Sequence, residues 1–253
     1  MRIIINCDDL GANARINNSI LELMEQKRVT SATLMMNGRA LEDALGRIGN
    51  FPQCSFGIHL NVTQFAPLSS HPGLQALLND KGEFAGVSLP NPRNIPLTSA
   101  IREGVYAEWC AQIERALDLG LPISHLDSHH HVHTKASLLG VLKRIQNKFG
   151  IRKVRMRRNV SGISSPMRWP RHLRNNAWNF AVRKYVGATT TDGFAAFSIF
   201  HERLQAGAGC PGTIELMCHP GRDSYAQETE LLQGDWLERM GPDAHLISYN
   251  ELR

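Results

Sequence analysis

The fold is decided by the stretch Arg2-Ile3-Ile4-Ile5-Asn6-Cys7-Asp8-Asp9-Leu10-Gly11. Its short, continuously apolar and β-branched run predicts a strand buried on both faces, which is typical of parallel sheets. From Ala14 to Lys27 the apolar residues recur at helical spacing, and a second predicted strand follows at Ser31 to Met36. The chain therefore begins with a strand, helix, strand unit.

The same alternation continues to the C-terminus and predicts seven or eight short apolar strands. No Gly-rich phosphate motif follows the first strand, so we expect a single α/β domain, a (β/α) barrel of seven to eight strands over residues 1–253, rather than an open dinucleotide-binding sheet. A length of 253 residues with 42% hydrophobic content suits one core. We expect a long loop at about 62–98 and a basic insert at about 157–176, both over the active-site end.

The composition indicates the cellular compartment of the protein and the charge of its binding partners. The five cysteines show no CxxC spacing, which indicates reduced thiols and a cytoplasmic protein. The apolar start is too short for a signal peptide, and no later run approaches transmembrane length. The net charge is +5, and much of the positive charge lies between Arg152 and Lys184. An anionic partner is therefore expected.

Reactive side chains fall at or just past the predicted strand ends. In a barrel those ends converge on one mouth, so these residues are candidates for a shared site. They are Asp8, Asp9, His59, Asn61, His125, Asp127, Arg155, Arg157, Asp192 and His219.

The run from His125 to His133 is the densest group of titratable side chains. It follows a predicted short strand, and strand alternation would point His125 and Asp127 into the same space. A solvated, histidine-rich surface loop is the competing interpretation.

One Asp and two His from three strands would form a metal site with open coordination positions, as catalytic rather than structural sites do. Such a site serves hydrolysis of an amide or ester. A neighbouring carboxylate would take the proton from water, and His219 is placed to protonate the leaving group. Taken singly, Asp9 could cap a helix, His59 could be a core histidine and His219 a loop histidine.

Four motifs together resemble the YdjC-like carbohydrate deacetylase family. They are Cys7 to Gly11, Gly57 to Leu60, Ser124 to His133 and Glu215 to Pro220, and the resemblance covers most of the chain except its basic middle. It implies a barrel of the glycoside hydrolase and deacetylase type, one divalent metal ion and removal of acetyl from an N-acetylated sugar.

The resemblance also implies roles for individual residues. Asp9, His59 and His125 match the metal ligands, Asp8 the base and His219 the acid. Asp127 and His129 would orient His125 or the sugar. Further substrate-binding or supporting candidates are Asn61, Arg155, Arg157 and Asp192. The family implies Mg²⁺, whereas the ligand set suits Zn²⁺, Co²⁺ or Mn²⁺ better.

The basic and aromatic segment between Arg155 and Trp178 departs from the family pattern. Its Trp side chains could stack on sugars and its Arg side chains could bind phosphate or carboxylate, which favours an anionic or lipid-linked glycan. With the resemblance, the expected substrate is a chitooligosaccharide-like sugar or a conjugated or lipid-linked amino sugar. A solvated basic loop is the alternative. Two other functions stay open, a metal-dependent phosphoesterase and a nucleic-acid or membrane-surface binding protein. Because the charge is confined to one segment, we expect no nucleic-acid partner. The sequence is compatible with a homo-oligomer.

Overall fold

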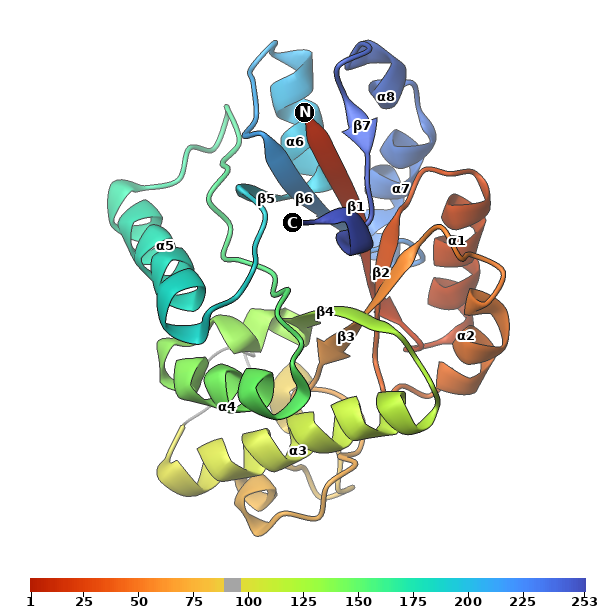
Figure 1. Ribbon diagram of the computed structural model, residues 1–253. Coiled ribbons are helices and arrows are strands. Elements are labelled where there is room, and N and C mark those ends of the chain that lie inside the picture. The colour runs from red at the N-terminus through yellow and green to blue at the C-terminus, as the bar shows by residue number, and fades with distance from the viewer. Residues whose placement is uncertain (89–96) are drawn as a thin grey trace.

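A curled parallel sheet forms the centre of the protein in a computed structural model that describes residues 1–88 and 97–253 (Figure 1). Its strands follow the order β4-β3-β2-β1-β6-β5, and β7 pairs with the first residues of β1. The strands are β1 (Arg2–Leu10), β2 (Ser31–Leu34), β3 (Ser55–Leu60), β4 (Ile123–Ser128), β5 (Gly193–Ala196), β6 (Thr213–Cys218) and β7 (His245–Leu246).

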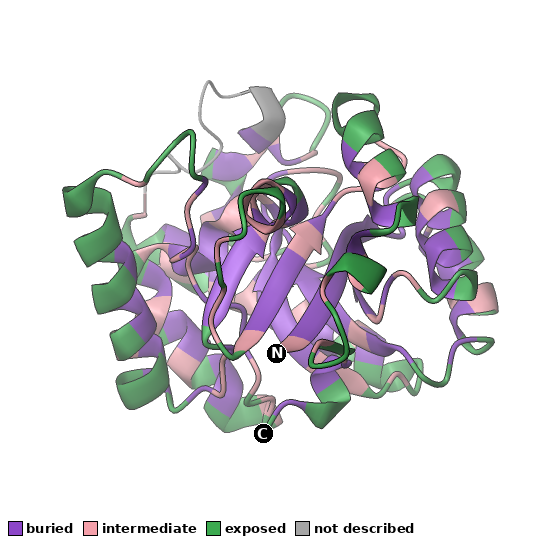
Figure 2. Cartoon of the chain, turned by 90° about the horizontal axis from the view of Figure 1, so that it is seen from above, coloured by how far each residue is buried: buried purple, intermediate pink, exposed green. Residues whose placement is uncertain are grey.

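Helices surround the sheet, and their outer faces are exposed while the strands are buried (Figure 2). The helices are α1 (Ala14–Glu25), α2 (Leu41–Ile48), α3 (Ser99–Asp118), α4 (Leu139–Phe149), α5 (Trp169–Ala181), α6 (Phe197–Gln205), α7 (Ala226–Gln233) and α8 (Trp236–Arg239). A π-helical turn, Val182–Val186, continues α5. No described helix is long and apolar enough to cross a membrane.

The first strand confirms the prediction of a parallel sheet. Ile3, Ile4 and Ile5 are fully buried because both faces of β1 are covered. The strand runs on to Leu10, and its pairing with β2 shifts register between Cys7 and Leu10. Asp9 lies at φ 71°, in the left-handed region. Neighbours in a regular strand point to opposite faces, so this irregularity is what lets two successive carboxylates face one site.

The predicted closed barrel is only partly formed. The sheet ends at β4 and β5, and residues 153–156, which lie between these strands in the chain, make just two isolated bridges, Leu126 with Val154 and Lys153 with Thr189. Among the described residues no ladder joins this segment to β5. The chain leaves the sheet after Met156 for an irregular basic stretch, so the ladder stops and the fold is a curled α/β sheet.

The C-terminal segment fills the end of the sheet where the strands begin. Tyr249, in the 3-10 turn Tyr249–Glu251, stacks on His125 with ring centroids 3.5 Å apart. Its hydroxyl donates a hydrogen bond of 2.5 Å to Glu215 Oε2. Because the C-terminal segment fills this end, the open end of the sheet is the one at the carboxyl ends of the strands.

The long segment predicted at about 62–98 is described up to residue 88 and from residue 97; residues 89–96 of that call lie outside the described part. It contains two short 3-10 helices, Pro72–Leu77 and Ala85–Ser88. The buried carboxylate of Glu108 on α3 accepts the backbone N–H groups of Leu68 and Ser69. Helix α3 thus holds the first half of this loop in place.

Candidate active site

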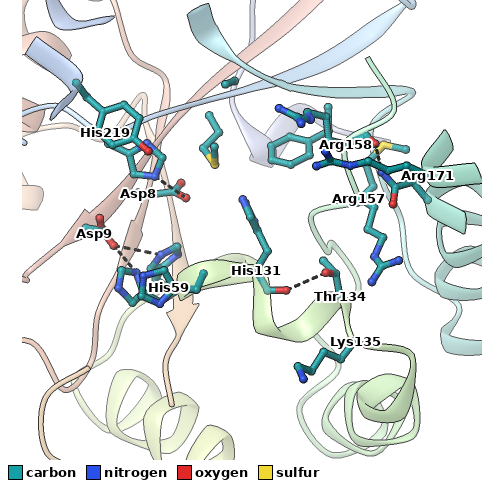
Figure 3. A pocket seen from close by; sticks show the side chains of 18 of the residues that line it. Asp8, Asp9, His59, His131, Thr134, Lys135, Arg157, Arg158, Arg171 and His219 are labelled. Atoms are coloured by element: carbon teal, nitrogen blue, oxygen red, sulfur yellow. Dashed lines mark hydrogen bonds and ion pairs between the residues drawn. The ribbon is translucent and has the colours of Figure 1, made fainter. Parts of the chain in front are cut away.

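A cavity of about 830 Å³ opens at the carboxyl ends of the strands. One wall carries Asp8, Asp9, His59 and His219, and the wall across from it carries cationic side chains (Figure 3). The cationic residues that line the cavity are Lys135, Arg157, Arg158, Arg171, Arg174 and Arg222. The strand ends and the basic insert therefore contribute to the same cavity.

Asp9, His59 and His129 form a buried cluster whose potential ligand atoms lie within 4.8 Å of one another. Asp9 Oδ1 is 3.3 Å from His59 Nε2 and 2.9 Å from His129 Nδ1. Neither oxygen of Asp9 has a hydrogen bond of acceptable geometry, although both are buried. Asp9 Oδ1 thus faces two imidazole nitrogens, and a buried carboxylate and two imidazoles that converge in this way fit a divalent metal ion.

Asp127 fixes the orientation of His59. Its Oδ1 lies 2.7 Å from His59 Nδ1, and the Thr33 hydroxyl donates to its Oδ2 at 3.1 Å. With the Nδ1 proton directed at Asp127, Nε2 keeps its lone pair towards Asp9, as in histidines that bind metals. Burial lowers the pKa of His59, but the charges of Asp127 and Asp8 outweigh it and raise the pKa to about 10, so a bound metal ion would take the place of a proton on Nε2.

The structure brings His129 to the cluster, whereas the family resemblance implied His125. Residues 125, 127 and 129 follow strand alternation and share a face, but each step of two residues advances roughly 7 Å along a strand. His125 is buried deeper, against Tyr249 and next to Gly57, and is in neither group of potential ligands found among the described residues. Burial holds the pKa of His125 well below its usual range, so the ring is neutral.

Asp8 is held by a buried ion-pair network centred on Arg155. Two guanidinium nitrogens of Arg155 contact the two oxygens of Asp8 at 2.7 Å each. The same guanidinium contacts Asp127 Oδ2 at 2.7 Å and Glu215 Oε1 at 2.7 Å. Burial alone would raise the pKa of Asp8, but the charge of Arg155 lowers it well below the usual range. Burial raises the pKa of Glu215 to about 7 in spite of Arg155.

The buried carboxylates of the site outnumber its two guanidinium groups. Four buried carboxylates face the fully buried Arg155 and the partly exposed Arg222. A second potential ligand group, formed by Asp8, His59 and Asp127, is already paired with Arg155. A metal there would have to displace the guanidinium, whereas Arg222 contacts only Oδ2 of Asp9 and leaves Oδ1 facing the two imidazoles, so the cluster of Asp9, His59 and His129 is the better metal site.

His219 lies on the other side of Asp8. Its Nε2 is 3.8 Å from Asp8 Oδ2, and its ring packs on Tyr225 with centroids 4.5 Å apart. The backbone N–H of His219 donates to Glu228 Oε1 at 2.9 Å, which fixes the turn after β6. Burial lowers the pKa of His219.

Two other predicted residues lie outside the cavity. Asn61 organises the turn after β3: its amide donates to Asn37 Oδ1 and Gln64 O, at 2.9 and 2.6 Å. Asp192 precedes β5, at the end of the sheet away from the cavity, and accepts the backbone N–H of Thr213 at 2.9 Å. The sequence argument placed Asp192 at a strand's carboxyl end, and the structure places it before a strand begins.

Two residues at the site were not singled out from the sequence. Arg222 contacts Asp9 Oδ2 at 2.5 Å, and it follows a turn in which Gly221 lies at φ 80°. Glu215 is fully buried within β6 and pairs with Arg155. A lone acidic residue in an apolar strand is a usable signal, because a buried charge needs a partner. No pattern in the sequence marks Arg222 as a neighbour of Asp9.

The chain belongs to the YdjC-like protein family, whose model matches residues 2–245. It is 32% identical over 221 residues to a carbohydrate deacetylase of Vibrio campbellii, covering 87% of this chain and 78% of the relative. It is 34% identical over 219 residues to a carbohydrate deacetylase of Geobacillus stearothermophilus, covering 86% and 78%. These relatives confirm the predicted family and the prediction of a hydrolytic deacetylase.

Solved structures share the fold. A protein from Enterococcus faecalis superposes with a TM-score of 0.74 at 24% identity, over 99% of this chain and 98% of the other. The Xyl-CE4 domain of a xylanase from a termite hindgut metagenome (Trinervitermes trinervoides) gives a TM-score of 0.51 at 10% identity, over 99% and 88%. Both support the curled α/β fold.

We expect Asp127→Asn to weaken metal binding by about 10- to 100-fold while the protein stays folded, because the amide cannot hold His59 in the same tautomer. Equilibrium titration with Mn²⁺ against a fluorescent chelator measures the change. Asp192→Asn is the matched control, since Asp192 lies outside the cavity, and it should bind the ion as the wild type does. Equal affinities for all three proteins would contradict the role given to Asp127.

Proposed function

We propose that this protein is a metal-dependent hydrolase that removes the N-acetyl group from an N-acetylated sugar. The observation that carries the proposal is the buried Asp9, His59 and His129 cluster, which lies beside Asp8 and His219 at the end of a cavity. The naming of curated relatives as carbohydrate deacetylases supports the sugar as substrate.

Each group has a separate task in the proposed reaction. Asp9, His59 and His129 hold a divalent ion, which when bound polarises a carbonyl and acidifies water. Asp8, kept anionic by Arg155, takes the proton of the attacking water. His219 delivers a proton to the departing amine from the other side. The amide C–N bond breaks, and acetate and the free amine leave.

The proposal also concerns the identity of the metal ion. The family resemblance favours Mg²⁺, but Mg²⁺ prefers oxygen ligands, and two imidazoles suit Zn²⁺, Co²⁺ or Mn²⁺ better. Reconstitution of the chelated protein with each ion separates these choices. The substrate we propose is a chitooligosaccharide-like or conjugated amino sugar, because the arginines across the cavity can bind an anionic group of a conjugate.

Acetate release from N-acetylglucosamine oligomers and conjugates tests the proposal. We expect release that stops on chelation and returns when one of the four ions is added. Loss of metal without loss of acetate release would overturn metal dependence. If no N-acetylated sugar releases acetate, the proposed reaction is wrong.

A metal-dependent phosphoesterase is the second candidate, favoured by the arginines and Lys135 that line the cavity across from the cluster (Figure 3). Cationic side chains and a metal ion together stabilise a phosphoryl group. Phosphate release from sugar phosphates without acetate release from N-acetylated sugars would select this candidate.

Asp8→Asn should lower acetate release by about 10²- to 10⁴-fold, the usual contribution of a general base, while the affinity for the metal changes little. His219→Gln should lower it similarly, because an amide cannot supply the proton. Asn6→Ala removes the hydrogen bond of 3.0 Å to Asp8, together with the bonds of Asn6 to Thr33 and Ser31, but keeps the Asp8 carboxylate and is the milder comparison. Activity above one tenth of wild type in Asp8→Asn would rule out Asp8 as the base.

A further inference from the structure

Helix α5 carries an apolar face that no other described element covers. Trp169, Leu173 and Phe180 are 73%, 54% and 64% exposed. Their spacing of four and seven residues places them on one side of the helix. Ile163 before the helix and Tyr185 after it are also exposed, at 50% and 57%. Five of the nine exposed large hydrophobic side chains of the described residues thus lie within 163–185.

The same segment concentrates the positive charge of the molecule. Residues 151–191 contain no Asp or Glu and hold ten of the chain's 28 Lys and Arg residues. Since the chain's net charge is +5, the rest of the protein is net acidic. Arg168 and Lys184 are exposed beside the two ends of α5, and Arg171 and Arg174 are exposed further round the helix, towards the cavity. The apolar face is therefore flanked by cations and by no anion of its own segment.

The opposite side of α5 is anchored to the cavity wall. Asn179 Oδ1 accepts the backbone N–H of Arg157 at 2.8 Å, and its amide donates to the carbonyl of Arg157 at 3.1 Å. The amide of Asn175 donates to the carbonyl of Arg158 at 2.8 Å. Arg171, Arg174 and Asn175 themselves line the cavity. Helix α5 therefore forms part of the cavity wall, and a surface that binds its outer face would lie one helix away from the cavity.

We propose that α5 docks on an anionic lipid bilayer, with Trp169, Leu173 and Phe180 entering the interface and the flanking cations facing the headgroups. An aromatic and aliphatic face bordered by arginines is the composition of helices that lie in membrane surfaces. Docking of α5 brings the cavity close to the bilayer surface, which makes an N-acetylated sugar carried by a lipid the preferred substrate. This last step rests on the proposed deacetylase function.

Charge argues against the other occupants. A second copy of the chain on the same face would bring two sets of arginines together without an acidic partner. A nucleic acid would satisfy the cations but would gain nothing from Leu173, whose aliphatic side chain cannot stack on bases. An anionic bilayer satisfies both the apolar and the cationic residues.

Co-sedimentation with vesicles tests the docking without any measure of deacetylation. The wild type should bind vesicles of phosphatidylglycerol and phosphatidylcholine, bind pure phosphatidylcholine weakly, and lose binding as salt rises. Trp169 is the one exposed tryptophan, since Trp109, Trp178 and Trp236 are buried. A blue shift of tryptophan emission on binding therefore reports burial of α5.

Paired variants make the test specific. Leu173→Ser with Phe180→Ser should weaken vesicle binding by at least about tenfold, because two apolar side chains no longer enter the interface. Leu117→Ser with Leu119→Ser is the control at the end of α3, where both leucines are 48% exposed, and it should bind as the wild type does. Acetate release from soluble sugars should be unchanged in both.

Three outcomes would overturn the proposal: no binding to anionic vesicles at low salt, binding without a shift of tryptophan emission, or equal binding by the Leu173 and Phe180 double variant. The last result, together with tight RNA binding by the same variant, would identify a nucleic acid as the partner. Vesicle binding without acetate release from any substrate would leave the docking in place and reject the deacetylase.

Discussion

His129→Ala is expected to lower acetate release by at least about 100-fold, because removing a ligand should cost more than removing a group that only orients one. The wild-type side chain contacts Asp9 at 2.9 Å and lines the cavity. Initial rates at saturating and at limiting Mn²⁺ separate lost affinity from lost chemistry. Excess ion should restore part of the rate if the main effect is on binding.

His125→Gln is the matched variant, because His125 lies within β4 only four residues before His129, which directly follows the strand. It lies against Tyr249 and Gly57, away from the cavity, so its deacetylase activity per folded molecule should stay within about threefold of wild type, a change below 1 kcal/mol. Loss of metal and activity in His125→Gln, with both retained in His129→Ala, would reverse the assignment of the third ligand.

Arg155→Met is expected to lower the free energy of unfolding by about 3–5 kcal/mol. The guanidinium is fully buried, and its removal would leave Asp8, Asp127 and Glu215 without their common counter-ion. Methionine fills much of the same volume but supplies no charge. Urea unfolding followed by circular dichroism measures the difference, with metal removed from both proteins so that ion binding does not contribute.

Arg144→Met is the control for that measurement. Arg144 pairs with Glu103 at 2.6 Å, but both side chains are nearly half exposed, so the cost should be at most about 1 kcal/mol. If Arg155→Met cost no more than Arg144→Met, the buried network would not be the stabilising centre described above.

Periodicity alone was enough to predict the general architecture. The apolar run at Arg2 to Asn6 and its repetition along the chain predict buried parallel strands, and the structure confirms them. Closure into a barrel could not be predicted in the same way, because it depends on long-range pairing. Residues 153–156 have the composition of a strand, yet they form only isolated bridges.

The position of the candidate site along β4 could be predicted only in part from the sequence. Alternation correctly predicts that His125 and Asp127 share a face, but it does not say how far along the strand the cavity begins. That depth depends on Tyr249, which fills the other end of the sheet from a distant part of the chain. The contact of Arg222 with Asp9 likewise depends on a turn geometry that a single sequence does not specify.

Anomalous diffraction from crystals of the protein soaked in Mn²⁺ tests the central claim most directly. We predict one strong peak bounded by Asp9, His59 and His129, within about 2.0–2.3 Å of a ligand atom from each, the usual range for carboxylate and imidazole ligands. A peak among Asp8, His59 and Asp127, or beside His125, would contradict the assignment of this metal site.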